Sequence, residues 1–308
     1  MKKIQLTCAH AIVKYLISQK ILVDGKKLPL FAGAFGIFGH GNVACLGQAL
    51  EENKKELPTW RGHHEQNMAL TGIAFSRAKR RKQIFVATSS VGPGSTNMLT
   101  AAAVAMSNRL PMLFLPGDTY ANRMPDPVLQ QVEHFNNPNI TQNDAFKYVT
   151  RYFDRITRPE QILQTFPQAI QTMIDPADCG PACISLSQDV QGETFDYPEE
   201  FFNEKIHTIR RPRPDDYQIK QAADLIKKSK NPIIISGGGI FYSDAMKELS
   251  QFAKKHNIPT AQTVMGYSTM KKDDPYFLGA IGGFGGKAPN DFMKKTDLAI
   301  AIGTKLAD

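Results

Sequence analysis

The sequence has little of what marks secreted or membrane-spanning proteins. Its 308 residues include four cysteines without CxxC spacing, which predicts reduced thiols in a cytoplasmic protein rather than a disulfide framework. No apolar run approaches the roughly 20 residues that a membrane-spanning helix needs. Lys14 interrupts the apolar stretch near the N-terminus, where the spacing favours an amphipathic helix over a signal peptide.

The excess of basic residues does not indicate nucleic-acid binding. The formal net charge is +8, and its dense cluster is residues 77–82, at the end of an expected helix. Cations there complement the helix dipole. No aromatic stacking platform or known nucleic-acid motif accompanies them, so we expect no nucleic-acid partner.

The length and the apolar pattern predict two domains. Helices alternate with short apolar strands, which is typical of a parallel sheet covered on both faces. Residues 1–190 are expected to form the first α/β domain, and the charged, aromatic and proline-rich residues 191–215 a linker. Residues 216–308 are expected to form an incomplete Rossmann-like domain, because the chain stops one loop after its third expected strand and leaves an unpaired edge.

Residues 60–105 are predicted to be helix, strand, glycine turn and helix. Glu65 lies near the start of the first helix, in an apolar segment where burial disfavours a charged carboxylate and favours a role that uses a proton. The strand 83–88 runs into a turn in which Gly92 and Gly94 allow a ligand to approach closely. A glutamate at a helix start is more often a partner of the helix dipole, and a glycine turn alone is a weak signal. Together they predict a ligand site.

Two loops are further candidates for function. Residues 28–36 are expected to form a strand that opens into residues 37–42, where His40 lies between two glycines. Ligands of parallel sheets bind at the carboxyl ends of strands, so His40 is a candidate catalytic residue, with a turn histidine bonded to backbone as the alternative. The long polar loop 122–143 contains Gln130, and unstructured loops of this length are usually functional.

A triple glycine after the strand 232–236 leaves two interpretations open. Glycines at such a position can hold a nucleotide such as NAD or FAD. Residues 237–239 lack the full GxGxxG spacing and a well-placed acidic residue after the next strand. The sequence therefore favours a tight structural turn.

Several motifs resemble those of a known family. Residues 61–67 (RGHHEQN) and 92–97 (GPGSTN) resemble the glutamate helix and the GPG turn of the thiamine-diphosphate enzymes of the acetolactate synthase group. Residues 35–42, 125–131 and 151–161 are more similar to the branch that hydrolyses trihydroxycyclohexanedione in myo-inositol catabolism. The resemblance runs through all 308 residues. It implies a pyrimidine-binding domain, a Rossmann-like middle domain, and a third domain that binds diphosphate and Mg²⁺.

The resemblance also assigns roles to individual residues. Glu65 matches the catalytic glutamate that hydrogen-bonds the pyrimidine nitrogen of the cofactor and shares a proton with it. The reaction implied is hydrolytic C–C cleavage that opens the ring of the cyclic 1,2-dione to give 5-deoxyglucuronate. The other residues carried over are, on the cofactor side, Gly92, Pro93, Gly94 and Asn97, and, on the substrate side, His40 and Gln130.

One family motif is absent. The diphosphate and magnesium motif, a Gly-Asp-Gly followed later by asparagines, does not occur, and residues 117–119 do not replace it. We therefore expect no metal ligands in this chain and little activity from it alone. The expected partners are further copies in a dimer or tetramer, or a chain that carries the third domain. The alternatives are an acetolactate-type carboligase and a catalytically silent fragment that associates with a full-length homologue.

Overall fold

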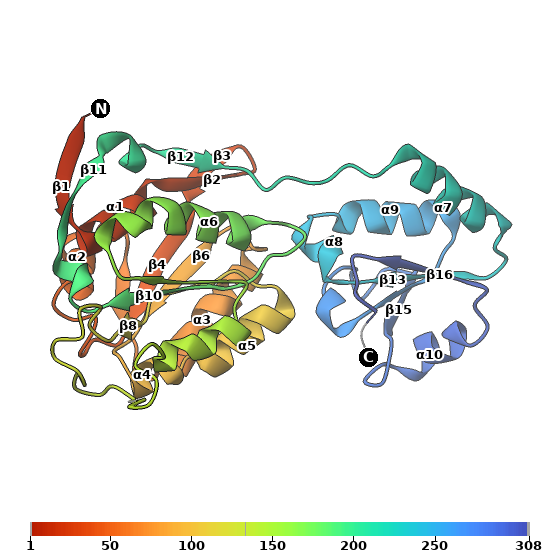
Figure 1. The fold of residues 1–308 in the computed structure, drawn as a ribbon. Coiled ribbons are helices and arrows are strands. Elements are labelled where there is room, and N and C mark those ends of the chain that lie inside the picture. Colours follow the sequence, from red (N-terminus) through yellow and green to blue (C-terminus); the bar gives the residue numbers. More distant parts are fainter. Residues whose placement is uncertain (1, 133, 307–308) are drawn as a thin grey trace. The chain divides into compact units, whose positions relative to one another are not determined.

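The computed structural model describes residues 2–132 and 134–306, and the chain divides into two units, Met1–Arg210 and Arg211–Asp308 (Figure 1). The first unit is built on a sheet with strand order β5-β4-β6-β7-β10-β8, and β9 pairs with β10. Every pair in this sheet is parallel, which confirms the expected parallel α/β fold. Its strands are β4 (Phe31–Gly36), β5 (Thr59–Arg61), β6 (Ile84–Thr88), β7 (Leu113–Phe114), β8 (Gly117–Asp118), β9 (Tyr152–Ile156) and β10 (Ala182–Ser187).

Helices cover both faces of this sheet, as Figure 1 shows for α1 and α6 on one side and α3, α4 and α5 on the other. Strands β6 and β10 are buried along their whole length because they lie between these layers. Three alanines of α5, Ala101, Ala102 and Ala105, are fully buried, so that this helix packs closely against its neighbours. The helices of the first unit are α1 (Cys8–Ser18), α2 (Leu46–Glu52), α3 (Glu65–Ala78), α4 (Pro93–Thr96), α5 (Leu99–Asn108) and α6 (Ile162–Ile174).

Two smaller sheets join the N-terminal segment to residues that follow the main sheet. Strand β1 (Lys3–Thr7) pairs antiparallel with β11 (Thr194–Pro198). Strand β2 (Gln19–Val23) pairs with β3 (Lys26–Pro29) and with β12 (Lys205–His207). Of the residues expected to form a linker, those up to 207 are thus part of the first unit. The Tyr197 side chain ties this segment to the first unit, because it is fully buried and its hydroxyl donates to the Pro159 carbonyl at 3.0 Å.

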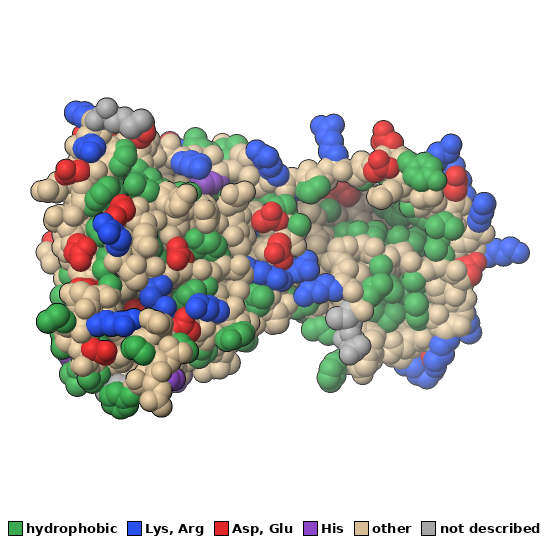
Figure 2. Space-filling view, in the orientation of Figure 1, with side chains coloured by type: hydrophobic (Ala, Val, Ile, Leu, Met, Phe, Trp, Pro, Cys, Tyr) green, Lys and Arg blue, Asp and Glu red, His purple; other side chains and the backbone are tan. Residues whose placement is uncertain are grey.

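The second unit contains a parallel sheet with the order β15-β14-β13-β16. None of the residues of α7 is buried, and Figure 2 shows hydrophobic side chains gathered at the surface of this unit. Strand β16 forms one edge of the sheet. The elements of this unit are α7 (Asp216–Lys228), β13 (Pro232–Ser236), α8 (Gly238–Tyr242), α9 (Met246–His256), β14 (Thr260–Gln262), β15 (Phe277–Ala280), α10 (Lys287–Met293) and β16 (Leu298–Ile302).

The helices of the described residues are short. None of them is both long enough and apolar enough to cross a membrane.

Candidate active site

Glu65 is the first residue of α3 and is half-buried. Strand β5 ends at Arg61, and the next residue, Gly62, donates from its backbone to the Gly36 carbonyl at 3.0 Å, which fixes where the helix begins. His64 caps the helix by accepting a hydrogen bond from the Asn67 backbone at 3.4 Å. A carboxylate in the first turn also interacts favourably with the helix dipole. The chain therefore places Glu65 at the carboxyl end of the parallel strands.

The glycine turn after β6 requires glycine at position 92. Gly92 has φ of +72°, a conformation that residues with a side chain rarely adopt. A Cβ there would lie 1.7 Å from the carbonyl oxygen of Gln130. The backbone of the long loop is therefore packed directly on the turn. Pro93 follows as the first residue of α4.

Asn97 and Gly94 determine what surrounds the Glu65 carboxylate. The Asn97 amide donates to Oε2 of Glu65 at 2.7 Å. A Cβ on Gly94 would lie 3.3 Å from Oε1 and 2.5 Å from the Ser90 hydroxyl, so the glycine leaves space next to that oxygen. The cavity at this point has a volume of about 540 Å³ and is lined by Glu65, Ser90, Pro93, Gly94, Thr96, Asn97 and Gln130. Five residues predicted from the sequence thus meet in one cavity.

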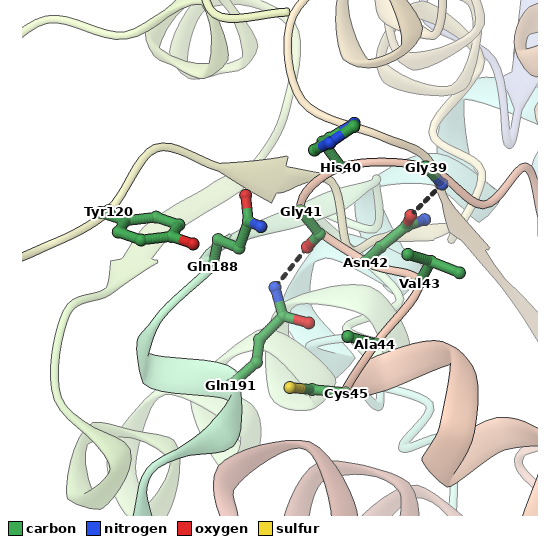
Figure 3. A pocket seen from close by; sticks show the side chains of 10 residues that line it. All are labelled: Gly39, His40, Gly41, Asn42, Val43, Ala44, Cys45, Tyr120, Gln188 and Gln191. Atoms are coloured by element: carbon green, nitrogen blue, oxygen red, sulfur yellow. Dashed lines mark hydrogen bonds between the residues drawn. The ribbon is translucent and has the colours of Figure 1, made fainter. Parts of the chain in front are cut away.

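His40 lies in the loop that follows β4, at the carboxyl end of the main sheet. Its backbone carbonyl accepts a hydrogen bond from Val91 at 2.8 Å, which ties the loop after β4 to the glycine turn. Its side chain is exposed and lines a second cavity of about 310 Å³, with the rest of loop 39–45, Tyr120, Gln188 and Gln191 (Figure 3). The imidazole forms no hydrogen bond with any residue that the structure describes.

Asn42, which the sequence argument did not single out, shapes this loop. Its side chain is 2% exposed. The amide nitrogen donates to the Ile37 carbonyl and to the Thr88 hydroxyl, both at 3.1 Å, and the amide oxygen accepts from the Gly39 backbone at 2.9 Å. One side chain thus joins the loop to the end of β6. Its position after two glycines is the only local signal that could have indicated this role.

A buried polar network lies beneath the glycine turn. The Ser95 hydroxyl donates to the Asn143 amide oxygen. The Asn143 amide nitrogen donates to the Ser185 hydroxyl at 2.7 Å and to the Gly117 carbonyl at 2.9 Å, and Ser185 donates to Asp118. The side chains of Ser95, Asn143, Ser185 and Asp118 are fully buried. Because its members are far apart in the sequence, no local pattern predicts it.

An ion-pair cluster anchors both ends of the long loop. Arg155 donates to Asp118 at 2.8 Å and to Asp144 at 2.9 Å, and Thr141 donates to Asp118 at 3.2 Å. Burial alone would lower the pKa of the Arg155 guanidinium, but the charges of Asp118 and Asp144 outweigh it and hold that pKa above its ordinary value. The loop that carries Gln130 is therefore fixed where it leaves the sheet and where it returns.

The triple glycine of the second unit serves close backbone packing. The backbone of Gly237 donates to the Ile302 carbonyl and that of Gly239 to the Gly303 carbonyl, each at 2.9 Å. A Cβ on Gly239 would lie 2.6 Å from the Cα of Gly303. These two N–H groups are already used within the unit, which favours the tight turn over a nucleotide site. Among the described residues there is also no group of three or more histidines, cysteines or carboxylates that could hold a metal ion.

Comparison with known proteins identifies the class. Residues 31–138 match the family described as thiamine pyrophosphate enzyme, N-terminal TPP binding domain, and residues 219–308 match thiamine pyrophosphate enzyme, central domain. The chain therefore belongs to the thiamine pyrophosphate enzymes, which confirms the resemblance of the glutamate helix and the GPG turn.

Individual relatives within this class are similar to the whole chain. The chain is 48% identical over 308 residues to proteins of Clostridium tetani and Geobacillus thermodenitrificans, and 47% identical to one of Bacillus cereus. Each is named 3D-(3,5/4)-trihydroxycyclohexane-1,2-dione hydrolase. Each match covers 100% of this chain and 48% of the relative, so the chain spans about half the length of the curated relatives it matches.

Proposed function

We propose that this chain is the pyrimidine-binding and central part of a thiamine-diphosphate enzyme that opens the ring of trihydroxycyclohexane-1,2-dione. The reaction is hydrolytic C–C cleavage to 5-deoxyglucuronate in myo-inositol catabolism, in the cytoplasm. The observation that carries the proposal is the Glu65 carboxylate, with one oxygen held by Asn97 and the other beside the space left by Gly94. The names of relatives that match the whole chain support the choice of substrate.

The residues around Glu65 fit the aminopyrimidine ring. A flat ring can lie against the Gly94 backbone because no side chain fills that place. Oε1 would hold or pass on a proton at a ring nitrogen, while Asn97 keeps the carboxylate from rotating. When bound, thiamine diphosphate supplies the nucleophilic carbon and the electron sink for C–C cleavage.

The domain assignment and the remaining contacts belong to the same proposal. The first unit is the pyrimidine-binding domain, and the second is the central domain. The diphosphate and its Mg²⁺ are held by residues outside these 308, in a domain that completes the site from another segment or another subunit. His40 and Gln130 face the substrate. The assembly is a dimer or tetramer, or a complex with a chain that carries the third domain.

Joining this chain to the remaining C-terminal half of the Geobacillus thermodenitrificans relative tests the activity. The fused protein is expected to consume the cyclic dione in the presence of thiamine diphosphate and Mg²⁺. The Glu65→Gln variant keeps the size of the side chain and loses its proton chemistry, so its rate should fall by about 100-fold or more. Consumption of pyruvate in place of the dione would favour the acetolactate-type carboligase.

Calorimetric titration of the unfused chain with thiamine diphosphate and Mg²⁺ tests where the diphosphate binds. No detectable binding is expected, because this chain supplies only the pyrimidine side. Micromolar binding would place the diphosphate site within the 308 residues and contradict that part of the proposal. The chain would be a catalytically silent fragment if the fused protein were inactive and the unfused chain co-eluted with a full-length homologue.

A further inference from the structure

The cavity beside loop 39–45 is separate from the one that contains Glu65 but shares a wall with it. Gly39 lines this second cavity. A Cβ on Gly39 would lie 3.0 Å from the Cβ of Ser90 and 3.8 Å from the amide oxygen of Gln130, and both of these residues line the Glu65 cavity. A molecule in the second cavity would therefore lie next to the proposed cofactor site, with only the loop backbone between them.

The second cavity contains a polar atom that lacks a partner. The amide oxygen of Gln188 is buried and accepts no hydrogen bond from any residue that the structure describes. Figure 3 shows this amide between the Tyr120 ring and Gly41. An unsatisfied buried oxygen destabilises the fold, so a ligand that donates a hydrogen bond there removes that cost.

The walls of the cavity favour an uncharged ligand. No lysine, arginine, aspartate or glutamate lines it, so a charged ligand would meet no fixed opposite charge. Burial raises the pKa of the Cys45 thiol, which keeps that group neutral. The Tyr120 hydroxyl and the His40 imidazole add groups that can donate or accept, while Val43 and Ala44 offer apolar contact to ring C–H groups.

The cavity is held open by the fold and is small. The Gln191 amide donates to the Gly41 carbonyl, and the Asn42 amide oxygen accepts from the Gly39 backbone, so the loop is fixed at two points. Its volume of about 310 Å³ is at the lower end of the range of small-molecule pockets, roughly 300–1,000 Å³. A single ring with its substituents fits this space, whereas a dinucleotide does not.

From these observations we propose that the second cavity binds a neutral, polyhydroxylated six-membered ring, with Gln188 accepting from a ring hydroxyl and Tyr120 contacting a neighbouring one. This inference rests on the proposed function, because it places the hydroxyl-bearing side of the substrate ring next to the Glu65 cavity. Gln188 and Tyr120 are then the residues that distinguish a polyol ring from a small keto acid such as pyruvate.

Binding of myo-inositol, a neutral cyclic polyol, to the unfused chain tests the inference without any enzymatic reaction. Ligand-observed NMR titration is expected to detect binding, and Gln188→Leu should weaken it about tenfold, because the amide oxygen is lost while the volume is nearly kept. Tyr120→Phe removes one hydroxyl and is expected to weaken binding by a smaller factor. Gln218→Leu makes the same change at an exposed position of α7 and should leave binding unchanged.

The outcomes separate this inference from the proposed function. Glu65→Gln is expected to leave polyol binding unchanged, and in the fused protein Gln188→Leu should raise KM for the dione more than it lowers kcat. The inference would be overturned if the chain did not bind the polyol. It would also be overturned if Gln188→Leu and Tyr120→Phe both bound the polyol as well as the unchanged chain does. A fused protein that fails to open the dione although its polyol binding depends on Gln188 would contradict the proposed function and leave the polyol site standing.

Discussion

The Asn97 amide nitrogen lies 2.7 Å from Oε2 of Glu65, although the two residues are 32 positions apart in the sequence. Glu65 begins α3, and Asn97 follows α4. The bond joins the glutamate helix to the glycine turn and fixes the rotation of the carboxylate. It leaves Oε1 as the oxygen beside Gly94, where a Cβ would be 3.3 Å away. The direction in which the carboxylate can exchange a proton is therefore set by the turn.

Replacing Asn97 by alanine is expected to lower kcat of the fused protein by about 10- to 100-fold, because a misplaced catalytic group loses much of its effect. The free energy of unfolding should change little, since Asn97 is only partly buried. Steady-state assays of dione consumption measure the rate. Asn203→Ala, at an exposed position, is the control for the substitution itself. An unchanged kcat would mean that the Glu65 carboxylate is oriented without Asn97.

Gly92→Ala is expected to destabilise the first unit and to displace the loop that carries Gln130. The new Cβ would lie 1.7 Å from the Gln130 carbonyl oxygen, and φ at this position is +72°. Gly25→Ala is the matched control, because Gly25 has φ of +75° and nothing within 4 Å of the added Cβ. The control measures the cost of a Cβ at positive φ without a clash, about 1–2 kcal/mol. Gly92 also has ψ of −126°, outside the left-handed helical region, which adds to the loss expected there.

The measurement compares the free energies of unfolding of the two alanine variants. Trp60 is the single tryptophan and lies in the first unit, 5.8 Å from the Phe85 ring, so its fluorescence during urea unfolding reports on this unit. Gly92→Ala should lose at least about 1 kcal/mol more than Gly25→Ala, as expected for overpacking against backbone. Equal losses would show that the contact with Gln130 does not constrain the turn.

Patterns along the chain are enough to predict the main sheet and the residues around Glu65. Strand β6 is apolar from Ile84 to Ala87 and leads into the glycine turn at Gly92, and both features are local. Strands β1 and β11 are different, because their pairing joins residues about 190 positions apart and each has only two apolar residues in alternation. This is why residues 194–207 were included in the expected linker, 191–215.

The site could be predicted only where one segment supplies several of its residues. Gly92, Pro93, Gly94 and Asn97 come from a single turn, so a local motif indicates them together. The sequence places His40 in a loop at the carboxyl end of a strand, but the direction of a loop side chain depends on contacts such as that of Asn42 with Thr88, which spacing does not reveal. The network of Ser95, Asn143 and Asp118 has no local signal at all, because long-range packing alone brings it together.

Asp118→Asn is expected to lower the free energy of unfolding of the first unit by about 2–4 kcal/mol. The side chain of Asp118 is 1% exposed, and the change removes the charge that faces the Arg155 guanidinium in a buried site. Asp144 keeps part of the interaction, which limits the loss.

Asp178→Asn is the matched control for Asp118. It makes the same change in an ion pair with Arg151 in which the aspartate is 66% exposed, and it should cost less than about 1 kcal/mol. Urea unfolding followed by Trp60 fluorescence compares the two variants. Similar small losses for both would mean that the buried ion pair does not stabilise the loop ends.

We expect His207 in β12 to make the stability of the first unit depend on pH. Burial, with a smaller contribution from the charge of Lys205, lowers the pKa of His207 to about 4 from an ordinary value of 6.5. As the pH falls from about 7 to 4, the unfolded chain takes up a proton that the folded unit does not, so stability decreases through this window and the effect levels off below it. Because the imidazole is partly exposed, the expected loss is about 1 kcal/mol.

Substituting glutamine for His207 isolates this contribution, because glutamine can still hydrogen-bond Gln19, whose amide oxygen lies 2.8 Å from Nε2 of the imidazole, but does not titrate. Urea unfolding of both proteins between pH 7.5 and 4, followed by Trp60 fluorescence, gives the difference in stability at each pH. We expect that difference to shift in favour of the His207→Gln variant as the pH falls, because only the wild-type unfolded state gains a proton. Curves that stay parallel over this range would mean that His207 is solvated equally in both states, and that the β2–β12 pairing does not bury it.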